Sequence, residues 1–86
     1  MDIVERKISS GVYRTDIIEY LLSISNSFDS KGTFIGSDWE VEVGNQEYRR
    51  LGSINLPVTM VIFRAEKHRC NEIMTAFRIK FLSAGG

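Results

Sequence analysis

Apolar residues alternate with polar ones in several stretches of the chain and recur at helical spacing in two others. Alternation is typical of strands, and repeats of three or four residues are typical of helices. Thr15 precedes the first helical repeat and is expected to cap it. The pattern predicts strands at 3–9, 39–43 and 58–64, a helix from 15 to about 26 and a helix over 66–75.

Gly44 and Asn45 follow the clear strand at 39–43 and predict a two-residue hairpin turn, since both residue types tolerate positive φ. The second strand of that hairpin would run over 46–50. Glu40 would then face Arg49, which is a favourable cross-strand pair. Glu42 would face Glu47, an unfavourable pair of like charges. The chain is expected to turn again at 52–55 before it enters the strand at 58–64.

The segment 76–82 fits two structures. Phe77, Ile79 and Phe81 alternate with Arg78 and Lys80, which favours a last strand. The same apolar residues also extend the helical stripe of 66–75, so one long helix to Phe81 is the alternative. The predicted element order is therefore β-α-β-β-β-α, with a further strand favoured at the end.

This order predicts a single α+β domain over residues 1–86. We expect a two-layer sandwich, ferredoxin-like or TBP-like, in which two helices cover one face of a mostly antiparallel sheet. A ubiquitin-like β-grasp fold would need a hairpin before its main helix. The short segment before Thr15 contains one strand, so the topology argues against β-grasp.

Except at Thr59, the strand at 58–64 is apolar on both sides, with Met60 and Ile62 on one side and Val61 and Phe63 on the other. The second face of a two-layer sheet normally meets water and is polar at alternate positions. Apolar residues there therefore indicate a cover. We assign Val61 and Phe63 to that outer face, as a candidate interface for a homodimer or a partner protein.

Composition narrows the function classes. Eleven basic residues balance eleven acidic ones, so the chain lacks the field that nucleic-acid binding uses, and no nucleic acid is expected. Charged residues interrupt the N-terminal segment, and no apolar run is long enough for a membrane helix, so we expect neither a signal peptide nor a membrane partner. The single cysteine, Cys70, cannot form an intrachain disulfide, which favours the cytoplasm.

The residues that carry chemistry are few. His68 and Cys70 are the only residues of their types, and positions two apart on a helix point in different directions. Cys70 lies on the predicted core stripe. We therefore predict no catalytic residue, no metal site and no cofactor, and a non-catalytic protein is favoured over an enzyme.

Two candidate sites remain. Arg64, Lys67, His68 and Arg69 surround the predicted start of the second helix, where free N–H groups attract anions, so a small-anion site is one alternative. The sequence also ends in Gly85 and Gly86, like the tails of ubiquitin-like sulfur carriers. A sulfur carrier activated at this diglycine is the other alternative.

Three parts of the chain are informative together: 36–43, 48–63, and 77–81 with the glycines that follow. They resemble the C-terminal domain of proteins related to the small subunit of molybdopterin synthase. The resemblance implies a small β-α-β4-α sandwich without an established activity, and it favours a final helix over a final strand. It also implies that the sulfur-carrier domain that precedes this domain in the family has no counterpart in the sequence. The expected function is a protein-binding or self-associating accessory domain, linked to molybdenum-cofactor assembly or sulfur transfer.

Overall fold

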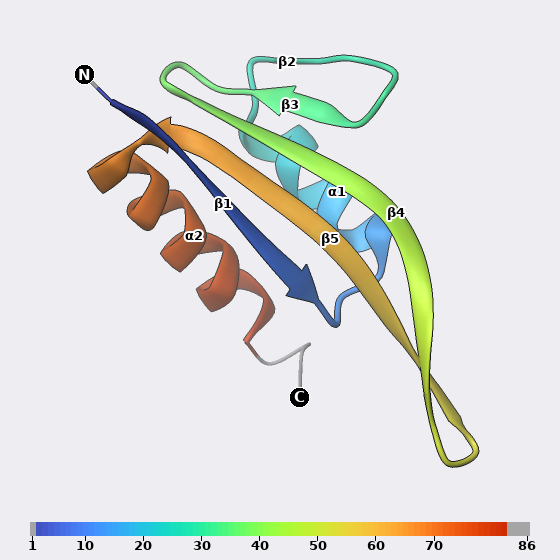
Figure 1. Ribbon diagram of the computed structural model, residues 1–86. Helices are drawn as coiled ribbons and strands as arrows, with labels where there is room; N and C mark the ends of the chain where they lie inside the picture. The colour runs from blue at the N-terminus through green and yellow to red at the C-terminus, as the bar shows by residue number, and fades with distance from the viewer. Residues whose placement is uncertain (1, 83–86) are drawn as a thin grey trace.

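Seven helices and strands make up residues 2–82, the part of the chain that the computed structural model describes. Their order is β-α-β-β-β-β-α, close to the predicted order (Figure 1). The elements are β1 (Ile3–Ser10), α1 (Arg14–Ile24), β2 (Ser27–Phe28), β3 (Thr33–Ile35), β4 (Trp39–Leu51), β5 (Ile54–Glu66) and α2 (Lys67–Phe81).

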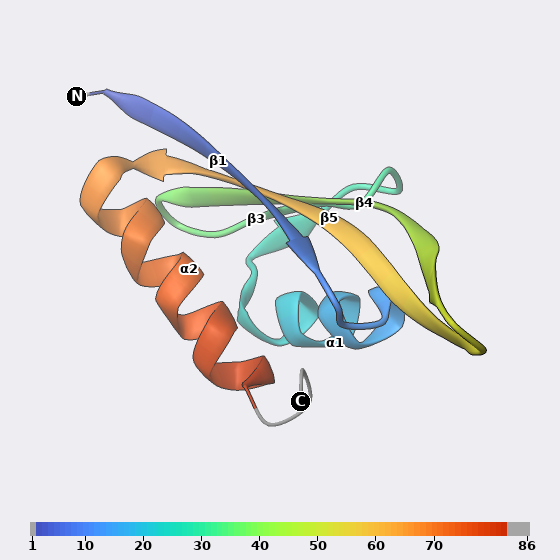
Figure 2. The same ribbon diagram turned by 60° about the horizontal axis from the view of Figure 1, so that its bottom comes forward.

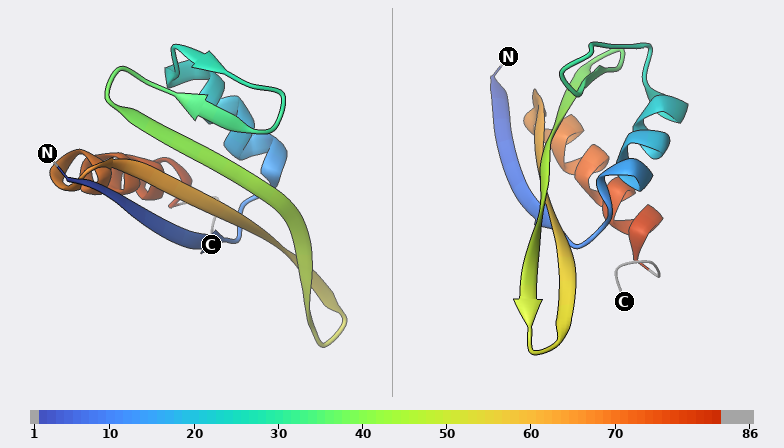
Figure 3. Two further views of the ribbon diagram at one scale, coloured as in Figure 1. Left: turned by 45° about the horizontal axis from the view of Figure 1, so that its top comes forward. Right: turned by 90° about the vertical axis from the view of Figure 1, so that its right-hand side faces the viewer.

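The five strands form one sheet in the order β1-β5-β4-β3-β2, and every neighbouring pair is antiparallel. Both helices lie against the same face of this sheet, as the edge-on views show (Figures 2 and 3). The predicted α+β two-layer sandwich is therefore confirmed.

The core lies between the sheet and the helices. Val61 and Phe63 of β5 point into it and are 0% and 1% exposed. Ile17 and Leu21 of α1 and Cys70 of α2 are fully buried around them. The assignment of Val61 and Phe63 to an outer interface is thus wrong, because the helices of the same chain cover both residues.

The hairpin turn also differs from the prediction. The chain passes Gly44 and Asn45 in a β-bulge, and β4 continues to Leu51. The turn lies at Gly52, whose φ of 63° suits glycine, and at Ser53. Beyond the bulge, β4 and β5 form a long two-stranded arm that projects from the rest of the molecule (Figure 1).

This longer hairpin changes the cross-strand partners. Glu40 lies opposite Arg64 and Glu42 opposite Ile62, so neither predicted pair with Arg49 or Glu47 forms. The unfavourable pairing of two glutamates is avoided in this way. The local turn chemistry at Gly44 and Asn45 is used to bend a strand, which is a common role of a bulge.

The predicted last strand is a helix. α2 continues to Phe81, as the family resemblance implied. Phe77 and Phe81 are four residues apart and therefore share one helix face, where both pack edge-on against Tyr20. Ile79 points away and is 68% exposed. A helix suits this segment because it buries the two aromatic rings and leaves the residues between them in water.

The first helix begins one residue before Thr15. Tyr13 occupies the cap position, and its side chain makes no capping hydrogen bond. The loop before α1 is held from the sheet instead, because the buried Thr59 hydroxyl donates to the carbonyl of Val12 at 2.9 Å. The predicted Thr15 cap is therefore replaced by a tertiary contact.

Candidate functional site

The face of the sheet opposite the helices carries an apolar stripe along β5. Five alternate residues of β5 point to this outer face, and all five are apolar. We call this set the outer β5 stripe. It consists of Ile54, Leu56, Val58, Met60 and Ile62.

The stripe is accessible in the single chain. Ile54, Leu56 and Met60 are 59%, 42% and 40% exposed, while Val58 and Ile62 are half-buried. At about 3.3 Å per residue the stripe extends for roughly 26 Å, from the end of the arm to the middle of the sheet. A strand with one face in water normally carries polar residues on that face. β5 instead carries apolar residues on its outer face as well.

A charged group closes the inner end of the stripe. Arg64 is the next outer residue of β5, and its guanidinium donates to three carboxylates from two neighbouring strands. The distances are 2.8 Å to Glu5, 2.7 Å to Glu40 and 2.9 Å to Glu42. Three carboxylates thus share one guanidinium, and the end of the stripe carries surplus negative charge, which Lys7, 4.0 Å from Glu5, reduces.

These contacts shift the pKa values of Glu5 and Arg64, in each case toward the charged form. The hydrogen bond from Arg64 lowers the pKa of Glu5, although some desolvation opposes it. The same hydrogen bond, followed by the one to Glu42, raises the pKa of Arg64. Both shifts favour the charged forms of Glu5 and Arg64, and the guanidinium of Arg64 is committed to its own chain.

The opposite end of the stripe has a different charge. Arg49 of β4 lies opposite Leu56 on the outer face of the arm, and Glu47 lies opposite Val58. Leu51 pairs with Ile54 beside the turn and is also exposed. The outer face of the arm therefore combines apolar surface with one arginine and one carboxylate, while carboxylates dominate the other end.

Two arginines of the predicted anion site, Arg64 and Arg69, are engaged with carboxylates. Arg64 points to the outer face, whereas Arg69 donates to Asp38 at 2.8 Å. The carboxylate of Glu66 accepts from the backbone N–H groups of His68 and Arg69, at 3.0 and 3.4 Å, and so caps α2 itself. The N–H groups that would attract a small anion already have a carboxylate, and these contacts argue against such a site.

Cys70 and His68 lie in different surroundings. The Cys70 thiol is buried and donates to the carbonyl of Phe63 at 3.7 Å, and burial raises the pKa of this thiol. His68 is exposed at the start of α2. A buried, protonated thiol is a poor nucleophile, so Cys70 acts as a core residue.

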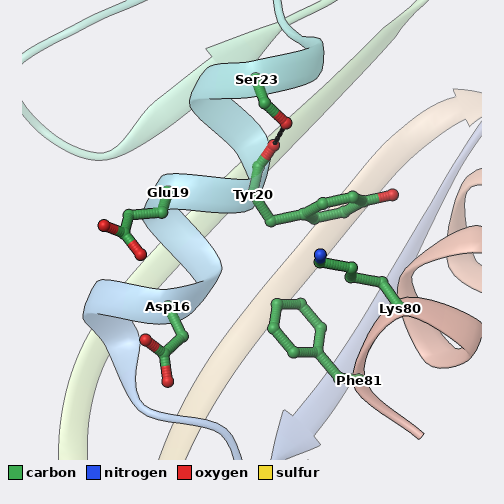
Figure 4. A pocket seen from close by; sticks show the side chains of 6 residues that line it. All are labelled: Asp16, Glu19, Tyr20, Ser23, Lys80 and Phe81. Atoms are coloured by element: carbon green, nitrogen blue, oxygen red, sulfur yellow. Dashed lines mark hydrogen bonds between the residues drawn. The ribbon is translucent and has the colours of Figure 1, made fainter.

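A groove of about 480 Å³ lies between the two helices (Figure 4). Tyr20 and Phe81 form its floor, and the carboxylates of Asp16 and Glu19 point away from the Tyr20 ring. The hydroxyl of Ser23 donates to the carbonyl of Tyr20 at 2.6 Å, within its own helix. The groove therefore presents a serine that is engaged in a helix hydrogen bond and not activated by a base.

The diglycine, Gly85 and Gly86, lies outside the described residues. Sequence reasoning identified β5 as the unusual strand, but it missed the outer residues of the stripe. The sequence does show these residues, because Ile54, Leu56 and Val58 occupy the same alternate positions as Met60 and Ile62. Pro57, between Leu56 and Val58, does not interrupt this alternation.

The protein is a small α+β sandwich domain whose outer sheet face is apolar along β5. The family model for the Archaeal MoaD-like protein matches residues 5–86, and the chain belongs to this family. The resemblance noted in the sequence is thereby confirmed at the level of the family. Curated proteins and solved structures give no significant match. Within the described residues, no helix is long and apolar enough to cross a membrane.

Proposed function

We propose that this chain is a non-catalytic protein-binding domain whose binding surface is the outer β5 stripe. The single observation that carries the proposal is the strand β5, which is apolar on the face that no helix covers. Membership of the MoaD-like family supports a role accessory to molybdenum-cofactor assembly or sulfur transfer. The compartment we propose for this role is the cytoplasm.

The energetics favour a covered stripe. Burying an exposed Leu, Ile or Met side chain completely contributes about 1.5–3 kcal/mol, and the stripe offers three such side chains that are at least 40% exposed. A partner that covered Ile54, Leu56 and Met60 would gain part of this energy from each, because each residue is already partly buried. The charged groups at both ends would set its orientation.

The polar groups support binding over catalysis. Arg64 and Arg69 are engaged with carboxylates, the Cys70 thiol is buried, and the Ser23 hydroxyl is bonded within its helix. Each of these groups thus has a structural role in the described part of the chain. A surface that is apolar with charged ends suits recognition of another protein.

Photo-crosslinking inside cells tests this proposal. A photoreactive phenylalanine analogue at Met60 should form adducts with a protein, whereas the same analogue at Ile79, on the exposed side of α2, should form few. Both positions are exposed and apolar, so the comparison isolates the face. Adducts at Ile79 only, or at neither position, would overturn the proposal.

The sulfur-carrier alternative has a separate test. One strand, β1, precedes α1, whereas the β-grasp fold of such carriers has a hairpin there. Incubation with an adenylating enzyme and ATP, followed by intact-mass measurement, should leave Gly86 unmodified. An adenylate or thiocarboxylate at Gly86 would instead support the carrier.

A further inference from the structure

We propose that the occupant of the outer β5 stripe is a second copy of this chain, stacked face to face with its β5 strand antiparallel to the first. The inference rests on the proposed function, because it names the partner of the same surface. A homodimer of this kind buries the stripes of both copies against each other. Stacked sheets of this type lie about 10 Å apart, with side chains interleaved.

The argument for a second copy is charge complementarity. The stripe has an acidic group at one end, built from Glu40, Glu42 and Glu5 around Arg64. It has Arg49 beside its other end, opposite Leu56, while Glu47 lies nearer the middle of the stripe, opposite Val58. A surface with opposite charges at its two ends is complementary to a reversed copy of itself.

The same charges decide the direction. If two β5 strands stacked parallel, the acidic group of one copy would face the acidic group of the other, and Arg49 would face Arg49. In the antiparallel stack the acidic end of each copy faces the arm of the other, which carries Arg49. Like charges across an interface are unfavourable, so the antiparallel arrangement is the consistent one.

The bulge helps to expose the stripe for this contact. Gly44 lies on the outer face beside Met60, and a Cβ at Gly44 would lie 3.3 Å from the carbonyl oxygen of Met60 and 3.4 Å from its Cβ. The glycine therefore leaves the centre of the stripe free of a neighbouring β4 side chain. Met60 can then insert between the residues of a facing stripe.

Sedimentation equilibrium on the purified full chain tests the inference. The wild type should have twice the monomer mass at micromolar concentration, and Met60→Asp should weaken the dimer at least tenfold. Ile79→Asp is the matched control, since it places the same charge on the exposed side of α2, and it should leave the dimer unchanged. Circular dichroism would check that both variants fold.

Charge reversal tests the direction of stacking. Glu42→Lys and Arg49→Glu should each weaken the dimer several-fold, and the double variant should recover most of the loss. A folded double variant that dimerises no better than the single variants would overturn the antiparallel arrangement. A dimer that Met60→Asp leaves intact would place the contact elsewhere, for example on the edge of β1.

The outcomes separate this inference from the proposed function. A monomeric wild type whose Met60 position cross-links to a different protein overturns the homodimer and leaves the protein-binding function in place. A monomer that forms no adduct at Met60 overturns both. A dimeric adduct at Met60, together with loss of the dimer in Met60→Asp, supports both.

Discussion

Arg14, the first residue of α1, donates from its Nε to the carbonyl oxygen of Gly44 at 2.8 Å. The backbone N–H of Arg14 also donates to the side chain of Gln46 at 2.7 Å. The two contacts hold both sides of the β-bulge, where the arm begins to bend away from the sheet. The start of the first helix therefore fixes the position of the arm.

Replacement of Arg14 by methionine should lower the free energy of unfolding by about 1.5 kcal/mol, because a charged hydrogen bond to a half-buried carbonyl is lost. Urea denaturation followed by circular dichroism measures the change. Arg78→Met, on the exposed part of α2, is the control and should change stability by less than about 0.5 kcal/mol. Equal effects of the two substitutions would show that Arg14 does not hold the bulge.

Arg64→Met should destabilise the protein at pH 7, with a fall in Tm of roughly 5 °C, because Glu5, Glu40 and Glu42 would then repel one another. In the wild type the pKa of Glu5 is lowered in the folded state, mainly by the hydrogen bond from Arg64. The stabilisation from Glu5 is therefore present above its unfolded pKa and is lost as the pH falls through the folded pKa.

Thermal unfolding between pH 3 and pH 7 checks this linkage. The difference in Tm between wild type and Arg64→Met should be largest at pH 7 and should shrink on acidification, as Glu5 becomes neutral. A difference that is the same at every pH would mean that Arg64 stabilises the fold by packing alone.

Gly36→Ala should destabilise the protein by about 2 kcal/mol, since a Cβ at Gly36 would overlap the indole ring of Trp39. Trp39 is the single tryptophan, so its fluorescence reports both unfolding and any shift of the ring. Gly11→Ala is the matched control, because no heavy atom lies within 4 Å of a Cβ there. The control should be neutral or slightly stabilising.

Phe77→Ala should cost about 3 kcal/mol, because the ring is buried and packs edge-on against Phe63 at a centroid distance of 5.5 Å. Ile79→Ala should cost less than about 0.5 kcal/mol, since Ile79 is exposed. Denaturant unfolding compares the two. Similar losses for both residues would favour a strand, in which they share one face.

Cys70 should react slowly with iodoacetamide in the native protein, more than about tenfold slower than in urea, because the thiol is buried and its pKa is raised. The chain has one cysteine, so intact mass gives the labelled fraction directly. Equal rates in the native and unfolded protein would contradict the buried position.

Local patterns located most of the helices and strands. The alternation in β1, in the first half of β4 and in β5, and the apolar repeats of α1, are properties of short segments and survive in the fold. The predicted turn at Gly44 and Asn45 was wrong. Its local chemistry fits a hairpin, yet Arg14 and Gln46 hold the same residues in a bulge, and Arg14 is distant in sequence.

The sequence by itself determined that β5 is apolar on two faces, and that Val61 and Phe63 lie on the side opposite Met60 and Ile62. Alternation separates these two sets but does not say which set the helices cover. Only the tertiary structure decided that question, because it depends on which face α1 and α2 reach when their own apolar stripes are buried. The sequence identified β5 as the strand that is apolar on both faces, and the fold identified the residues that remain exposed on it.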